Sequence, residues 1–261
     1  MAGSTTLYAW VHPLSVDKDL DHTWVTDYAP PPVYATIGDV VSAGGHYWYC
    51  WGSYHPAGVS STYPGGAIGN APGNLQQSSC IAAPNDSSAH GSIFRYAING
   101  VCHQLANQVL YSTDGPLTVS KARGYWLSSF LYDTYGRPDS DWQKLKNSCM
   151  GTGGSSVDDF EDHVRKMLGD AATPEKLAAL AAQRDEFQKF IDGTAMEAHA
   201  ENAEEAAGGI NSSVSRALMM AAEILGPDDF EKVFGTKIKE SFSLIDPEQF
   251  AISEAAHKDS R

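Results

Sequence analysis

Apolar and polar positions alternate in two different ways along this chain of 261 residues. Residues 22–28 and 46–51 are rich in aromatic and β-branched side chains, and each run is followed by proline or glycine, which predicts two β-strands. Residues 93–98 predict a third strand. Residues 56–91 contain much Gly, Pro, Ser and Asn with few long apolar side chains, and we interpret them as a long irregular loop.

A helical pattern begins directly after the third of these runs. Asn99-Gly100 is a turn signal, and Val101, Leu105 and Val109 then recur at helical spacing. The sequence therefore predicts a strand, a short turn and a helix that starts near residue 101.

Helical patterns continue through the last hundred residues. One apolar stripe comprises Val157, Phe160, Val164 and Leu168. A second helix is predicted to open at Thr173-Pro174, because proline is favoured at the first helical position, and its apolar face comprises Leu177, Leu180, Phe187 and Ile191.

The end of the chain is expected to be less regular. Gly208-Gly209 interrupts a third stretch rich in Ala and Glu, and Pro227 and Gly235 bracket a short helix. The final dozen residues are expected to be frayed.

Composition divides the chain at residues 151–156. All six Trp, all twelve Tyr and all four Cys precede this point, whereas no Glu occurs in the first 150 residues. Aromatic, Gly-rich sequence favours strands and structured loops, and Glu/Ala/Lys/Leu-rich sequence favours helices. We therefore predict an α+β domain over residues 1–150 and a helical, acidic C-terminal region over residues 156–261.

The charge and the cysteines restrict the function classes. A formal charge of −14 argues against partners that are nucleic acid or anionic membrane. No apolar run approaches the ~20 residues of a membrane span, and no basic segment followed by an apolar one precedes the first strand, so a cytoplasmic location is expected. The cysteines form no CxxC pair, and we expect all four to be free thiols.

Cys102 is the residue that raises the question of catalysis. In the first turn of a helix, unsatisfied N–H groups and the positive end of the dipole favour thiolate over thiol. A proton-accepting histidine is also needed, and His22 and His46 lie on or at the start of predicted strands. His103 points about 100° away around the helix and is interpreted as structural. Cys50 alternates with aromatic residues and is interpreted as core.

Two segments carry a resemblance to a known family. FRYAINGVCHQLANQVL and DHTWVTDY resemble the Cys-led helix and the histidine-bearing strand of circularly permuted papain-like thiol enzymes, in the lecithin-retinol acyltransferase-like and deubiquitinase-like branches. The matching positions are Tyr96, Ile98, Asn99, Cys102, Ala106, Asn107, Leu110 and His22. The resemblance covers about residues 20–112. Val101 replaces the usual Asn, and a longer gap follows His22, so the third catalytic residue is either His46 or its rival, His55.

The resemblance implies a fold and a reaction. The fold is a permuted papain-like domain with a small antiparallel sheet, followed by the helical region. The reaction is cysteine-dependent acyl transfer at an amide, thioester or ester, in which Cys102 attacks a carbonyl and His22 takes its proton. His46 would orient the imidazole of His22, and the Cys102 backbone N–H would stabilise the oxyanion. No cofactor and no metal are implied.

The substrate is expected to be a small-molecule or peptide acyl compound. Candidate substrate-binding residues are Trp24, Trp48, Tyr125, Trp126 and Arg123, with Arg123 or Arg137 pairing a substrate carboxylate. The alternative is that the aromatic residues form a packed core layer. The acidic helices after residue 155 are interpreted as a solvated cover or as a homodimer surface.

Two other function classes stay open from the sequence. One is a non-catalytic binding module with an aromatic pocket. The other is a metal-dependent hydrolase that uses His22, His46, His55 and Cys102, whose residue types suit zinc although their spacing is not that of a typical site.

Overall fold

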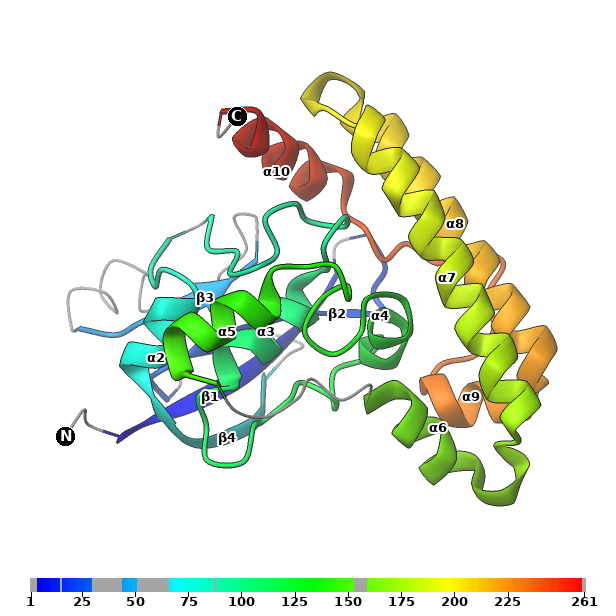
Figure 1. Cartoon of the computed structure of the whole chain (residues 1–261), viewed down its shortest axis with the longest axis horizontal. Coiled ribbons are helices and arrows are strands. Elements are labelled where there is room, and N and C mark those ends of the chain that lie inside the picture. Colours follow the sequence, from blue (N-terminus) through cyan, green and yellow to red (C-terminus); the bar gives the residue numbers. More distant parts are fainter. Residues whose placement is uncertain are drawn as a thin grey trace.

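The computed structural model describes residues 4–14, 16–29, 44–50, 66–86, 88–152 and 159–259. It is a mixed α+β structure with one four-stranded antiparallel sheet, whose strand order is β3-β2-β1-β4, and nine α-helices within the described ranges. The sheet and most helices of the first 150 residues lie on one side of the molecule, and the helices of residues 159–234 lie on the other (Figure 1). The last helix, residues 247–259, returns to lie over the first part of the chain.

The sheet includes two predicted and two unpredicted strands. β2 (Asp21–Thr26) and β3 (Tyr47–Tyr49) confirm the two aromatic runs as strands. β1 (Ser4–Pro13) and β4 (Gly66–Asn74) were not predicted from the sequence. β4 contains three glycines and a proline, a composition that argues against a central strand but is tolerated here because β4 lies at the edge of the sheet.

The two faces of the sheet carry different clusters. Side chains that point to the helices belong to the main core, and they include Leu7, Ala9, Val25 and Trp48. The opposite face carries a separate aromatic cluster of Trp10, Trp24, Tyr47 and Tyr49. Because side chains alternate along a strand, each residue of β1 and β2 belongs to one face only.

Two predictions about the segment before the central helix are wrong. The predicted loop over residues 56–91 contains β4 and a helix, α2 (Leu75–Ile81), although residues 56–65 lie outside the described residues. The predicted strand over residues 93–98 is a series of turns with one isolated bridge between Tyr96 and Gly100. Ala97 has a φ of 66°, which no strand accommodates.

The predicted helix after Gly100 is confirmed as α3 (Cys102–Leu110), and all nine of its residues are buried. Its polar side chains are paired with backbone. Three amides each donate to one of three consecutive carbonyls: Gln104 to Asp133 (2.9 Å), Asn107 to Thr134 (2.7 Å) and Gln108 to Tyr135 (2.5 Å). We call these three bonds the amide ladder.

Helices α4 (Tyr125–Tyr132) and α5 (Trp142–Met150) complete the first part of the chain. The C-terminal region consists of α6 (Asp159–Leu168), α7 (Pro174–Glu197), α8 (Ala203–Leu225), α9 (Pro227–Phe234) and α10 (Pro247–Asp259). The side chain of Thr173 caps α7 by accepting the Lys176 N–H, and the four predicted apolar positions of α7 are buried.

Two expectations about these helices are corrected. Gly208-Gly209 does not interrupt a helix, because α8 passes through both glycines and buries an apolar stripe beside them, including Ala207 and Ile210. The final dozen residues are helical as far as the described residues extend, to Asp259. α10 is held because Glu254 forms a buried, bidentate ion pair with Arg95, at 2.8 and 2.6 Å.

Arg95 links three parts of the chain. Besides Glu254, its guanidinium donates to the carbonyls of Ala195 and Ala198 at the end of α7, at 2.6 and 3.4 Å. Both partners of the ion pair are almost fully buried. This arrangement ties α7 and α10 to the segment that precedes α3.

The expectation of four free thiols is wrong. Cys80 of α2 and Cys149 of α5 form a disulfide across 69 residues, and Cys50 and Cys102 are free. Cys80 and Cys149 are far apart in the sequence, and the packing of α2 against α5 brings them together, so the sequence alone did not predict the pair. In the described part of the chain, no helix is both long enough and apolar enough to cross a membrane.

The disulfide makes a simple prediction. Titration of unreduced protein with Ellman's reagent in denaturant should detect two thiols rather than four, and a peptide map should contain a linked pair of Cys80 and Cys149. Four reactive thiols in protein purified without reductant would contradict the pairing.

The buried ion pair predicts a large loss of stability in a single variant. Arg95→Met should lower the free energy of unfolding by about 3–5 kcal/mol, because Glu254 is left as an uncompensated buried charge. Urea denaturation measures the loss. The matched control is Arg165→Met, which breaks an exposed pair with Glu161 and should cost within about 0.5 kcal/mol. Equal losses in both variants would contradict the role of Arg95.

Candidate functional site

Cys102 is the first residue of α3 and lies against β2. Only 5% of the surface of Cys102 is exposed to solvent. Thr23, on the face of β2 that meets the helices, contacts the thiol through its backbone and side chain, and the backbone of His103 contacts it from the helix. The thiol therefore occupies the first turn of a helix, as the sequence predicted.

The electrostatic expectation for this thiol is wrong. Burial raises the pKa of Cys102 to about 11, and the polar contacts from Thr23 and His103 lower it only in part. Desolvation disfavours the thiolate more strongly than these groups favour it. Cys102 is thus a neutral thiol in this conformation.

A second thiol and a phenol lie near Cys102. Cys50 and Tyr96 are both buried, and burial raises the pKa of each well above its ordinary value. Negative charge on Cys102 would raise both pKa values further. The site thus has few groups that stabilise an anion.

His103 joins the helix to its neighbours. Its Nε2 lies 3.0 Å from the carbonyl oxygen of Asp21, and its Nδ1 lies 2.7 Å from the hydroxyl of Ser128. Since a carbonyl only accepts, Nε2 carries the proton and Nδ1 accepts from Ser128 in the neutral ring. Burial lowers the pKa of His103 to about 4. The structural interpretation of His103 agrees with these contacts.

His22 is not brought to Cys102. It lies between Asp21 and Thr23 on β2, and its ring stacks on Trp24, 5.9 Å away between centroids. Trp24 belongs to the aromatic cluster on the far face of the sheet. Because Thr23 faces Cys102, His22 points away from it in this structure.

His46 has its own carboxylate partner. Its Nδ1 lies 2.6 Å from Asp27 Oδ2, and its backbone N–H donates to Asp27 Oδ1 at 2.7 Å. Asp27 is four residues beyond Thr23, a distance of about 13 Å at strand spacing. His46 and Asp27 form an oriented, part-buried pair that is separate from Cys102. His55, its rival as the third residue, lies outside the described residues.

Three of the four predicted aromatic binding residues are in the interior, and Trp126 is partly buried. Trp24, Trp48 and Tyr125 are almost fully buried, and the Trp48 indole N–H donates to the Ala82 carbonyl at 2.8 Å. Trp126 stacks on the ring of His163 with 3.5 Å between centroids. These contacts agree with the alternative of a packed aromatic layer.

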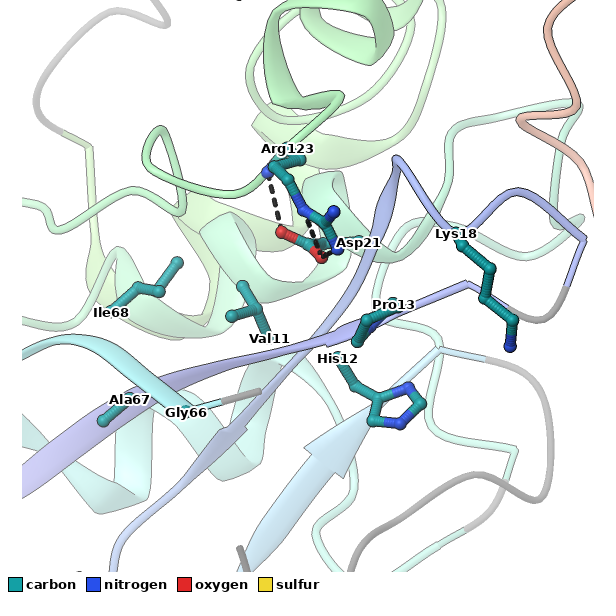
Figure 2. A pocket seen from close by; sticks show the side chains of 9 residues that line it. All are labelled: Val11, His12, Pro13, Lys18, Asp21, Gly66, Ala67, Ile68 and Arg123. Carbon is teal, nitrogen blue, oxygen red and sulfur yellow. Dashed lines mark hydrogen bonds and ion pairs between the residues drawn. The ribbon is translucent and has the colours of Figure 1, made fainter. Parts of the chain in front are cut away.

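Arg123, in contrast, lines a pocket of about 800 Å³. Its Nε and Nη2 donate to Asp21 Oδ1 at 3.1 and 2.7 Å, and its backbone N–H donates to Asp21 Oδ2 at 2.8 Å. Figure 2 shows this pair on the same side of β1 as Val11 and Ile68, whereas His12 points the other way. The guanidinium side chain is 49% exposed.

Sequence reasoning did not place Thr23 beside Cys102, Asp21 beside Arg123, or Asp27 beside His46. Alternation along β2 was the available signal, since Asp21, Thr23 and Val25 necessarily share a face that excludes His22. The direction of that face became known only once α3 was placed. Within the described ranges, no group of three or more His, Cys, Asp or Glu could hold a metal ion.

Comparison with known proteins found no match: no family model, no curated protein and no solved structure is significantly similar to this chain.

The buried imidazole predicts a pH dependence of stability. The folded-state pKa of about 4 lies below the ordinary value of 6.5, so His103 stabilises the fold fully above pH 6.5, and this contribution is lost as the pH falls towards 4. The loss should amount to about 3 kcal/mol.

Urea denaturation between pH 7 and 4 tests this contribution. His103→Gln keeps a donor for the Asp21 carbonyl and should show a shallower decline than the unmodified protein. The exposed His199→Gln is the control and should decline as the unmodified protein does. Parallel declines in all three proteins would exclude the effect.

Proposed function

We propose that the chain is a cysteine-dependent acyl-transfer enzyme with Cys102 as its nucleophile. The observation that carries the proposal is the place of this thiol at the first residue of α3, against the strand β2. A cysteine that begins a helix packed on an antiparallel sheet is also the arrangement implied by the resemblance to permuted papain-like enzymes.

In the proposed reaction, Cys102 Sγ forms a bond to the carbonyl carbon of an amide, thioester or ester, and the leaving group departs with a proton. The acyl group is then transferred from sulfur to water or to an amine. The backbone N–H of Cys102, at the helix start, supplies the oxyanion donor. No cofactor enters this scheme.

The proposal assigns no general base. His22 points to the far face of the sheet, His46 is paired with Asp27, and both ring nitrogens of His103 are engaged. The proposed roles of His22 as base and His46 as orienting group gain no support from these positions. What supports the scheme is the place of the thiol at the start of α3.

The second candidate is a non-catalytic binding module. The burial of Cys102 and the raised pKa of its thiol favour it, because neither suits a nucleophile. The accessible pocket beside Arg123 favours it as well. In this scheme Cys102 is a core residue.

The expected surroundings of the protein are part of the proposal. We propose a small-molecule or peptide acyl substrate, no binding to nucleic acid or membranes, and a homodimer through the C-terminal helices. A cytoplasmic location was expected from the sequence. The Cys80–Cys149 disulfide counts against it, because such bonds are rare in the cytosol.

An activated ester separates the two candidates. Incubation with p-nitrophenyl acetate should add one acetyl group to Cys102, seen by intact mass and peptide mapping and released by hydroxylamine. Cys102→Ala should abolish this adduct, whereas Cys50→Ala, the matched buried cysteine, should retain it.

The pH dependence of alkylation by iodoacetamide completes the test. The rate at Cys102 should rise with pH towards a midpoint of about 11. A protein that forms no acetyl adduct on Cys102, or that is acetylated equally after Cys102→Ala, is the binding module and not the enzyme.

A further inference from the structure

The pocket at the end of β1 combines an apolar floor with a guanidinium. Val11, Gly66 and Ile68 contribute from the two neighbouring strands β1 and β4, and Arg123 contributes from the segment that precedes α4. Its volume of about 800 Å³ is within the range of small-molecule sites.

A bulge in β4 shapes this floor. The register between β1 and β4 shifts between Ala9 and Trp10, which leaves Ile68 as the extra residue of β4. A bulge re-aims side chains, and Ile68 points to the side of β1 that carries Val11, Arg123 and Asp21 (Figure 2). The aliphatic side chains of Val11 and Ile68 thus lie on the same side of β1 as the guanidinium of Arg123.

Asp21 holds Arg123 in place but does not engage all the hydrogen-bond donors of its guanidinium. Three bonds to Asp21 fix its backbone and side chain, and Asp21 itself is almost fully buried. Among the described residues, no hydrogen bond engages Nη1 of Arg123, and the side chain is half exposed. A guanidinium fixed in this way loses little conformational freedom on binding.

The charged side chains that line the pocket favour a ligand with a single negative charge. Arg123 and Lys18 are cationic, Asp21 is anionic, and burial lowers the pKa of His12 so that it is neutral near pH 7. The lining then has a net charge of +1. The nearby acids Asp17 and Asp19 share Lys239, at 3.1 and 2.7 Å, which leaves one further negative charge outside the lining and makes Arg123 the local group that attracts an anion.

We propose that this pocket binds a small aliphatic monocarboxylate, whose carboxylate is recognised by Arg123 and whose chain lies on Val11 and Ile68. The inference goes beyond the proposed function, because binding needs neither the thiol of Cys102 nor a general base. If the enzyme proposal also holds, this is the anionic end of its substrate.

Calorimetric titration with hexanoate, compared with the neutral hexanamide, tests the site. Hexanoate should bind and hexanamide should bind at least about tenfold more weakly, because a hydrogen bond between ions is lost. Arg123→Gln should weaken hexanoate binding by a similar factor. Arg165→Gln, an exposed arginine on α6, is the control and should leave binding unchanged.

A second variant tests the site independently, in case Arg123→Gln does not fold. Gly66 is the cross-strand partner of Val11, and a Cβ at this glycine would meet nothing within 4 Å. Gly66→Phe should therefore block the pocket while the Arg123–Asp21 pair stays intact, and hexanoate binding should be lost.

The outcomes are distinct from those of the enzyme test. Cys102→Ala should bind hexanoate as the unmodified protein does, whatever the result of acetylation. The proposal is overturned if hexanoate does not bind, if hexanamide binds equally well, or if binding survives Gly66→Phe.

Discussion

A helix that is buried on every side must find partners for its polar side chains inside the protein, and α3 imposes this requirement on the rest of the structure. An unpaired buried amide costs about 1–3 kcal/mol, so the amide ladder sets the path of residues 133–135. The segment before α3 is fixed in the same way, because the Gln108 side chain also bonds the backbone and hydroxyl of Ser92. The same hydrogen bonds therefore fix the position of α3 and the paths of the two segments that contact it.

The sequence predicted the elements whose apolar residues repeat regularly. α3, α7 and β2 follow such patterns, and their buried apolar positions are those expected. It did not predict that His103, Gln104, Asn107 and Gln108 are buried, because a polar residue carries no sign of whether its partner is water or a carbonyl 25 or more residues away. α10 was missed for the same reason, since Glu254 and Arg95 are far apart in the sequence.

The candidate site shows where local reasoning ends. The start of the helix at Cys102 was predictable from a turn signal and a periodic pattern. The pKa of its thiol was not, because the helix terminus and desolvation act in opposite directions and the depth of burial decides between them. The position of His22 depends on which face of β2 meets α3, and that choice is made by packing.

The ion pair between Arg95 and Glu254 joins residues 159 positions apart, and this separation has a consequence for biosynthesis. At about 5–20 residues per second, translation needs roughly 10–30 seconds to pass from the arginine codon to the glutamate codon. During that interval, the guanidinium that will be buried has no carboxylate to meet, and the nascent α3 region cannot close around it. Arg95 therefore gains its carboxylate partner only after α10 has been synthesised, and a chain shortened to end before α10 would leave the guanidinium without that partner.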